Sequence, residues 1–249
     1  MTTYKAPLRD MRFVMEDVLD YERHYASLPG CEEVNLELVN AILEEASKFS
    51  EEVVAPLNAV GDQEGCRMTE DGEVRTPSGF KEAYRQYIDS GWPALDQPGR
   101  YGGQDLPMSL GLSVREMNGT ANWSWNMYPG LSHGAMETIE EHGTDEQKAI
   151  FMEPLVSGRW TGTMCLTESH CGTDLGLLKT KAEPVADGTY RITGSKVFIS
   201  SGDHDLAENI VHIVLARLPD SPPGTKGISL FIVPKFIPSE DGTIGERNE

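Results

Sequence analysis

Cysteine is scarce in this sequence, and long apolar runs are missing from it. The cysteines are Cys31, Cys66, Cys165 and Cys171. Four thiols in 249 residues do not make the disulfide framework of a small secreted domain, so we expect reduced thiols. No apolar run approaches the length of a membrane span, and the charges between Arg9 and Asp20 exclude the apolar part of a signal peptide. These absences predict a soluble, cytoplasmic protein.

Basic clusters and phosphate-binding glycine motifs are also missing. The formal net charge is −19, which repels nucleic-acid phosphates, and no Lys/Arg cluster interrupts the acidic pattern. Neither G-x-G-x-x-G nor G-x-x-x-x-G-K-[ST] occurs, so nothing indicates a Rossmann turn or a P-loop. Nucleic-acid binding is therefore not expected. A polyanionic ligand such as coenzyme A would have to be held by local amides and a few placed cations.

Two short runs that end in small polar turns stand out in the second half of the chain. The first covers residues 161–168 and continues through a turn to Asp174, and the second covers residues 196–201 and closes at Gly202. Such runs of β-branched, apolar and hydroxyl residues, bounded by Gly and Asp, are typical of strands. Their ends offer backbone amides and hydroxyls without bulky side chains. The residues alone therefore predict a polar, planar, partly anionic ligand across two strand ends.

The order of these residues resembles the two flavin-binding segments of the acyl-CoA dehydrogenases. A C-x-T-E-x-x-x-G-[ST]-D turn occupies residues 165–174, and an aromatic-Ile-[ST] run follows at residues 198–200. The Y-G-G loop at 101–103 and the G-T-x-E-Q-K run at 143–148 are further family landmarks. The opening residues 4–10 resemble the extra N-terminal segment of the 3-methylmercaptopropionyl-CoA dehydrogenase subgroup.

The resemblance implies FAD as the cofactor and assigns residues to it. The implied cofactor-binding residues are Met164, Leu166, Thr167, Gly172, Thr173, Phe198, Ile199 and Ser200. Met164, Leu166 and Thr167 would meet the isoalloxazine ring. Thr173, with Gly172 clearing space, would meet the flavin and its phosphates or the thioester of the substrate. Phe198 would cover one side of the ring, and Ser200 would bond near the hydride-accepting nitrogen. Donors at the electron-rich edge of the ring favour the reduced flavin.

The turn departs from the family pattern in a way that raises a metal alternative. The family commonly has Pro-Gly-Ala where this chain has Ser169, His170 and Cys171, and it has Trp where this chain has Phe198. The first exchange brings an imidazole and a thiol close to the flavin turn. With Cys165 these residues form a C-x₄-H-C spacing, which matches no common zinc pattern. We therefore predict no metal site.

The pattern along the chain, with the resemblance, predicts an α+β fold. We expect an N-terminal extension helix in residues 1–34, a helical domain in 35–158 and an incomplete, antiparallel, barrel-like β domain in 159–249. The expected helices are 8–25, 35–57 capped by Asn35, 78–88 capped by Ser78, 107–122, 131–142 and 144–156 with a capping box at Thr144. The expected strands are 161–168, 179–185, 190–193, 196–201, 209–217 and 227–233.

The implied reaction is α,β-dehydrogenation of an acyl-CoA thioester, which needs a flavin on one face and a carboxylate base on the other. The family's base, a glutamate in a C-terminal helical bundle, has no counterpart here and is expected beyond Glu249. We thus expect a truncated chain that does not turn over alone and that belongs to a homo-oligomer when full length. Our best substrate is 3-(methylthio)propanoyl-CoA, with electron-transfer flavoprotein as the acceptor.

Three other functions stay open at this point. A flavin-dependent acyl-CoA oxidase would differ by its reactivity with oxygen. A DNA-alkylation-response homologue is disfavoured because the sequence has no basic tract. A flavin-free interaction module of the same fold would lack the yellow colour of bound flavin.

Overall fold

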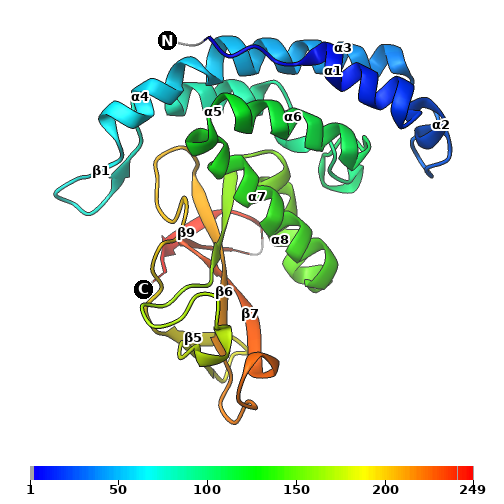
Figure 1. Cartoon of the computed structure of the whole chain (residues 1–249). Coiled ribbons are helices and arrows are strands. Elements are labelled where there is room, and N and C mark those ends of the chain that lie inside the picture. Colours follow the sequence, from blue (N-terminus) through cyan, green and yellow to red (C-terminus); the bar gives the residue numbers. More distant parts are fainter. Residues whose placement is uncertain (1–2, 240, 249) are drawn as a thin grey trace. The chain divides into compact units, whose positions relative to one another are not determined.

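The computed structural model describes residues 3–239 and 241–248 (Figure 1). The chain divides into two units. The first comprises the residues up to Gly130 together with Val156–Arg159 and His204–Leu206. The second comprises Leu131–Leu155, Trp160–Asp203 and the residues from Ala207 onward. Within the described ranges, no helix is both long enough and apolar enough to cross a membrane.

The first unit is helical. Its helices are α1 (Leu8–Arg12), α2 (Tyr21–Ala26), α3 (Leu36–Phe49), α4 (Pro56–Glu64), α5 (Phe80–Asp89), α6 (Met108–Ala121) and the first part of α7 (Trp123–His142). Strands β1 (Arg67–Met68) and β2 (Val74–Arg75) pair antiparallel. One buried cluster includes Met11, Tyr25, Leu43, Leu110 and Met117. Helices α1, α2, α3 and α6 therefore share a core.

The first two predicted helices are each interrupted in the structure. The single helix expected over 8–25 is wrong, because a π-helical turn (Phe13–Val18) follows α1 and Asp20 adopts a left-handed φ of 49° before α2. A second π-helical turn (Ser50–Val54) separates α3 from α4, and Pro56 begins α4 inside the range expected as one helix, 35–57. A proline lacks the amide hydrogen that the first turn of a helix leaves unused, so it suits this position.

The N-cap predicted at Asn35 is confirmed. Its Oδ1 accepts a hydrogen bond of 3.0 Å from the amide of Leu38. We expect Asn35→Ala to lower the free energy of unfolding by about 1 kcal/mol, because one amide at the helix start loses its acceptor. Urea unfolding followed by circular dichroism measures the loss. Asn35→Asp keeps the acceptor and should stay within a few tenths of wild type; an equal loss in both variants would show that the cap does not act through this bond.

Two other sequence expectations in this unit are wrong. The residue directly before α5 is Gly79, with a φ of 82°, so Ser78 is not the N-cap. The Ser78 amide instead donates to Glu64 Oε2 at 2.8 Å. Helix α7 begins at Trp123 rather than at 131, so the aromatic run 123–128 lies on its first turns. Trp125 is fully buried but Trp123 is 67% exposed, because one helical turn cannot direct both indoles into the same core.

The second unit combines two helical segments with a mixed sheet. The remainder of α7 and α8 (Asp145–Val156) precede the strands β3 (Trp160–Cys165), β4 (Lys181–Pro184), β5 (Tyr190–Thr193), β6 (Asn209–Arg217), β7 (Ile228–Pro234), β8 (Phe236–Pro238) and β9 (Ile244–Arg247). The capping box predicted at the start of α8 is confirmed: Thr144 and Gln147 exchange hydrogen bonds of 2.9 and 3.3 Å.

The α+β class is confirmed, with a sheet that is mixed rather than wholly antiparallel. β3 and β4 run parallel to β6, whereas β5 and β7 pair antiparallel with β4 and β6. Parallel pairing of β3 with β6 requires the long connection between them. The strands expected near 179–185, 190–193, 209–217 and 227–233 are present as β4 to β7. The strands β8 and β9, which pair antiparallel, were not predicted.

The strand expected at 196–201 is wrong. Residues 194–199 have no regular secondary structure, and a turn follows. Phe198 and Ser201 adopt left-handed φ values of 57° and 55°, which a strand does not accommodate. The segment is therefore an irregular loop, and its position depends on side-chain and backbone bonds to other parts of the second unit.

Candidate functional site

The candidate site begins where β3 ends. Cys165 is the last residue of that strand and is buried, while the neighbouring Met164 is exposed. The chain then turns tightly: the amide of Glu168 donates to the Cys171 carbonyl at 2.9 Å, and the amide of Cys171 donates back to the Glu168 carbonyl at 3.1 Å. This bridge places Gly172 and Thr173 directly after a rigid turn, with the Thr173 side chain exposed.

The structure brings the two predicted flavin segments side by side. The Val197 amide donates to the Thr167 carbonyl at 2.9 Å. One residue earlier, Lys196 Nζ donates to the Leu166 carbonyl at 3.1 Å. Two adjacent residues of one segment therefore bond to two adjacent residues of the other, although the second segment is not a strand.

A buried carboxylate, that of Glu168, also bonds the first segment to the second. Glu168 is 5% exposed. Its Oε1 accepts from the Thr180 amide, the Thr180 hydroxyl and Lys196 Nζ at 2.9, 2.6 and 3.0 Å, and its Oε2 accepts from the Lys179 amide at 2.9 Å. Burial alone would raise the pKa of Glu168, but these donors outweigh it and lower the pKa to about 2. The side chain is therefore an anion over the whole physiological range.

Phe198 stands free of the protein core. It is 92% exposed and its backbone is left-handed, a conformation that is a genuine outlier for a bulky residue. The Gly202 amide donates to the Ile199 carbonyl at 3.2 Å, which closes the turn after Phe198 and leaves the Ser200 side chain exposed. An exposed aromatic ring on a strained turn is a feature that accompanies binding sites.

Gly172 was expected to clear space for a ligand. A Cβ at this position would meet Thr167 Cγ2 at 3.5 Å, which is an ordinary contact. Gly172 also has no left-handed φ. The surrounding protein atoms therefore do not themselves require glycine here, and its assignment to the cofactor stays a prediction.

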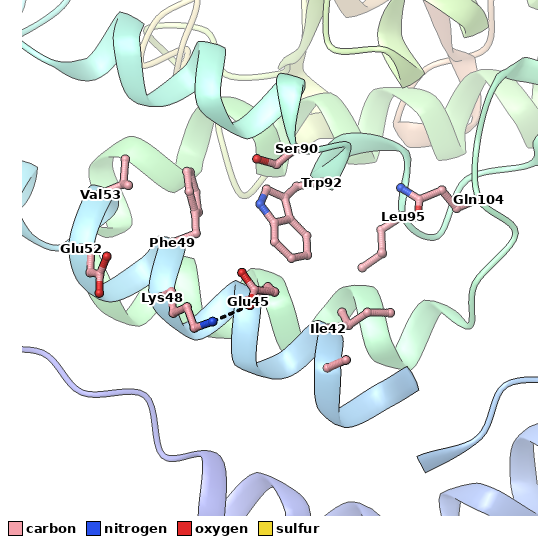
Figure 2. A pocket seen from close by; sticks show the side chains of 11 residues that line it. Ile42, Glu45, Lys48, Phe49, Glu52, Val53, Ser90, Trp92, Leu95 and Gln104 are labelled. Atoms are coloured by element: carbon pink, nitrogen blue, oxygen red, sulfur yellow. Dashed lines mark hydrogen bonds and ion pairs between the residues drawn. The ribbon is translucent and has the colours of Figure 1, made fainter. Parts of the chain in front are cut away.

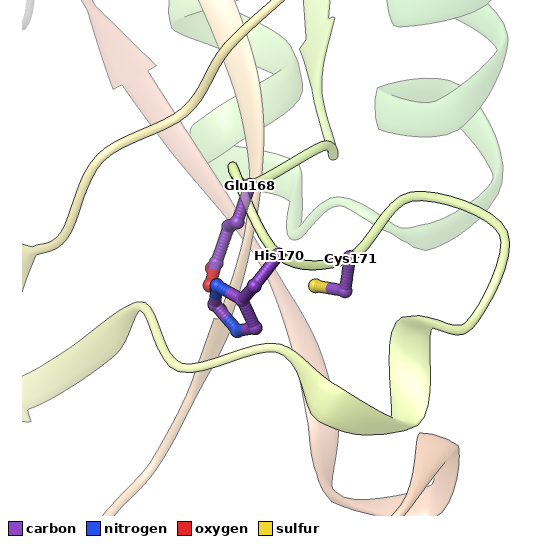
Figure 3. Close-up of side chains that lie close together, drawn as sticks. All are labelled: Glu168, His170 and Cys171. Atoms are coloured by element: carbon purple, nitrogen blue, oxygen red, sulfur yellow. The ribbon is translucent and has the colours of Figure 1, made fainter.

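Glu168, His170 and Cys171 form a group whose ligand atoms all lie within 4.8 Å of one another (Figure 3). The group differs from the Cys165, His170 and Cys171 set considered from the sequence, because Cys165 Sγ lies instead 3.7 Å from Thr163 Oγ1. Protein atoms already engage the group: Glu168 accepts four hydrogen bonds, and His170 Nε2 lies 3.0 Å from the Leu177 carbonyl. That no metal binds here stays a prediction.

The first unit contains a cavity of about 500 Å³ (Figure 2). It is lined by Ala41, Ile42, Glu45, Lys48, Phe49, Glu52, Val53, Ser90, Trp92, Leu95 and Gln104. Glu45 and Lys48 pair with each other at 2.5 Å, and most of the remaining wall is apolar. The lining includes no thiol or imidazole, so we assign no chemistry to this cavity.

Sequence reasoning missed the residues that join the two segments. Glu168 appeared only as a letter of the motif, and Thr180 and Lys196 were not singled out. They lie 12 and 28 residues from Glu168, and no periodic pattern connects positions so far apart. The sequence hint of this ion pair was a glutamate at the end of the first segment and a lysine at the start of the second.

Comparison with known proteins gives a consistent result for both parts of the chain. Residues 37–159 match the acyl-CoA dehydrogenase N-terminal domain, and residues 163–247 match the acyl-CoA dehydrogenase middle domain. The chain is 44% identical over 246 residues to 3-methylmercaptopropionyl-CoA dehydrogenase of Ruegeria pomeroyi, covering 99% of this chain and 42% of that protein. The chain thus spans about two fifths of the length of this relative.

Solved structures agree with the sequence matches. Butyryl-CoA dehydrogenase of Megasphaera elsdenii superposes with a TM-score of 0.65 at 26% identity, over 81% of this chain and 49% of that one. An acyl-CoA dehydrogenase of Bacillus anthracis, complexed with FAD, superposes with a TM-score of 0.61 at 25% identity, over 82% of this chain and 31% of that one.

Proposed function

Because this chain belongs to the acyl-CoA dehydrogenase family, whose cofactor is FAD, we propose that it supplies the flavin-binding part of an enzyme that desaturates acyl-CoA thioesters. The reaction removes a proton from the α carbon and a hydride from the β carbon. The hydride acceptor must lie within about 3–3.5 Å of the substrate carbon. The chain's part of this task is to hold that acceptor.

One observation carries the proposal: the bond between the Val197 amide and the Thr167 carbonyl. It brings the Leu166–Thr167 peptide next to the loop that presents Phe198 and Ser200. A planar ring bound across this junction would meet an aromatic face from one segment and hydroxyl or amide donors from both. The exposure of Phe198 and Ser200 leaves these groups available to a ligand, so the residues fit a flavin.

The proposed roles of the individual residues follow from their exposed groups. FAD, when bound, supplies the hydride acceptor. Thr167 and Ser200 would donate hydrogen bonds to its polar edge, and Phe198 would exclude water from one face of the ring. Thr173, exposed after the rigid turn, would contact the phosphates or the substrate thioester. We assign the proton-abstracting base to no residue between Thr3 and Asn248.

The substrate and partners are proposed from similarity. The Ruegeria relative acts, by its name, on 3-methylmercaptopropionyl-CoA, and this chain shares 44% of its residues with that protein over the matched region. We propose the same short thioether acyl-CoA, 3-(methylthio)propanoyl-CoA, as the substrate. Electron-transfer flavoprotein as the electron acceptor and a homo-oligomeric assembly are proposed from the family resemblance.

Titration with FAD tests the proposal. We expect saturable binding that quenches flavin fluorescence, and we expect Phe198→Ala to weaken it at least about fivefold because an aromatic contact is worth about 1 kcal/mol beyond its area. Phe13→Ala is the matched control, since Phe13 is also exposed but lies in the first unit; its affinity should equal that of wild type. A wild-type chain that binds no FAD, or equal weakening in both variants, would contradict the proposal.

A further inference from the structure

We propose that the Glu168–Lys196 ion pair positions and polarises the Leu166–Thr167 peptide against the flavin, so that the pair favours binding of the reduced cofactor over the oxidised one. The inference rests on the proposed function, because it takes that peptide as a flavin contact. It assigns a role in tuning the flavin to two side chains that we do not propose as direct cofactor contacts.

The first step is the anchoring of Glu168. Three of its donors come from Lys179 and Thr180, at the entry to β4. Backbone amides do not change their charge or rotate away, so they hold the carboxylate in one place. Three of the four donors to the carboxylate thus come from the stretch that enters β4, and one, Lys196, comes from the loop that carries Phe198.

The second step is the placement of the Lys196 charge. The lysine side chain is 10% exposed and its Nζ lies 3.0 Å from Glu168 Oε1. A lysine ammonium that is removed from water needs an anionic partner and further acceptors to remain charged. The Leu166 carbonyl, at 3.1 Å, is such an acceptor. Glu168 therefore holds a positive charge directly against the oxygen of the Leu166–Thr167 peptide.

The third step follows from the electronic structure of the amide. The carbonyl of Leu166 and the amide of Thr167 belong to one conjugated group. A cation at the oxygen draws electron density away from the nitrogen, and hydrogen bonds that polarise one another in this way become stronger. The Thr167 amide becomes a better donor as a result. A better donor stabilises the reduced flavin, which carries more negative charge, more than the oxidised flavin.

The same contacts also determine the position of the Phe198 loop. The Val197 amide bonds to the Thr167 carbonyl, directly next to the Lys196 contact. Loss of the ammonium would remove the bonds of Lys196 to the Leu166 carbonyl and to Glu168, and so weaken the hold on the segment. The ion pair therefore acts on the cofactor in two ways that can be measured separately, through the position of the loop and through the polarity of the peptide.

The test uses Lys196→Met, which removes the charge and keeps the length of the stem, and Glu168→Gln, which keeps the shape of the carboxylate. Lys196→Arg retains the charge. Lys181→Met is the matched control, because Lys181 is an exposed lysine on β4 of the same unit. Thermal unfolding first confirms that each variant is folded.

Two measurements follow. In the flavin-free chain, hydrogen exchange of the Val197 amide should rise about fivefold in Lys196→Met and Glu168→Gln, since one net hydrogen bond is worth about 1 kcal/mol. In the flavin-loaded protein, Lys196→Met should weaken reduced FAD about tenfold more than oxidised FAD, which shifts the midpoint potential by about 30 mV to more negative values. Lys196→Arg and Lys181→Met should match wild type in both.

The possible outcomes test this inference separately from the proposed function. Unchanged Val197 exchange overturns the positioning role. Equal weakening of both flavin states overturns the polarising role and would indicate a merely structural ion pair. A wild-type chain that binds neither state counts against the proposed function, while Val197 exchange still decides by itself whether the pair holds the loop.

Discussion

Gly162→Ala is expected to lower the free energy of unfolding of the second unit by about 3 kcal/mol. Gly162 lies in the middle of β3, paired with Val211 of β6. A Cβ at this position would lie 2.4 Å from the Ala135 Cβ and 3.3 Å from the Ser132 Cα. Neither neighbour is the flexible end of a long side chain, so the backbone of β3 or α7 would have to move.

The close approach of β3 to α7 also allows a hydrogen bond between them. The Gly162 amide donates to Ser132 Oγ at 3.0 Å, and a shift large enough to relieve the clash would lengthen it. The expected loss therefore combines overpacking with the weakening of a buried polar contact.

Gly134→Ala is the matched control. Gly134 lies in α7, and an added Cβ would have no atom within 4 Å. Alanine is the better helix former, so this variant should gain about 1 kcal/mol. Urea unfolding of both variants measures the difference. Equal unfolding midpoints for Gly162→Ala and wild type would contradict the packing of β3 against α7.

The second large effect is a loss of folding stability at low pH. The pKa of Glu168 is lowered from 4.5 to about 2 in the folded chain. A carboxyl whose folded pKa lies below its unfolded pKa stabilises the fold above the unfolded value, and the contribution disappears as the pH falls through the folded value. A shift of this size corresponds to about 3 kcal/mol at neutral pH. We expect that amount to be lost between about pH 5 and pH 2.

Glu168→Gln isolates this contribution from the other carboxyl groups of an acidic chain. The stability difference between wild type and Glu168→Gln should shrink as urea unfolding is repeated from pH 6 down to pH 3. Glu183→Gln, an exposed change on β4, is the matched control for removing one carboxyl group from the same unit. A wild-type advantage over Glu168→Gln that is constant with pH would show that the carboxylate is not held as an anion by its donors.

Much of the helical structure followed from local patterns. α3, α6 and α8 begin close to the predicted positions because an N-cap, a proline and a capping box act within one turn of the chain. The errors share one feature, because an apolar periodicity does not register polar side chains. Asp20 Oδ1 accepts from the Arg23 amide at the start of α2, and Asn122 Oδ1 accepts from the Trp125 amide at the start of α7. Before α5, the Ser78 amide bonds to Glu64 of α4 and Gly79 forms the turn.

The sequence predicted part of the candidate site. The motif indicated two segments, and the structure joins them by the bond between the Val197 amide and the Thr167 carbonyl; that they bind FAD stays a prediction. The motif wrongly indicated a strand for the second segment, because the β-branched and aromatic residues there also suit a loop whose Phe198 is exposed. The ion pair of Glu168 and Lys196 was not predicted, since its partners lie 28 residues apart.

The sequence by itself determined the family, the order of helices before strands and the two segments that we assign to FAD, because these depend on residue types in a fixed order. Only the tertiary structure decided that β3 pairs in parallel with β6 and that one buried carboxylate joins three separate stretches of chain. The physical reason is that a buried charge needs several donors at once, and the fold alone brings Thr180 and Lys196 within hydrogen-bonding distance of Glu168.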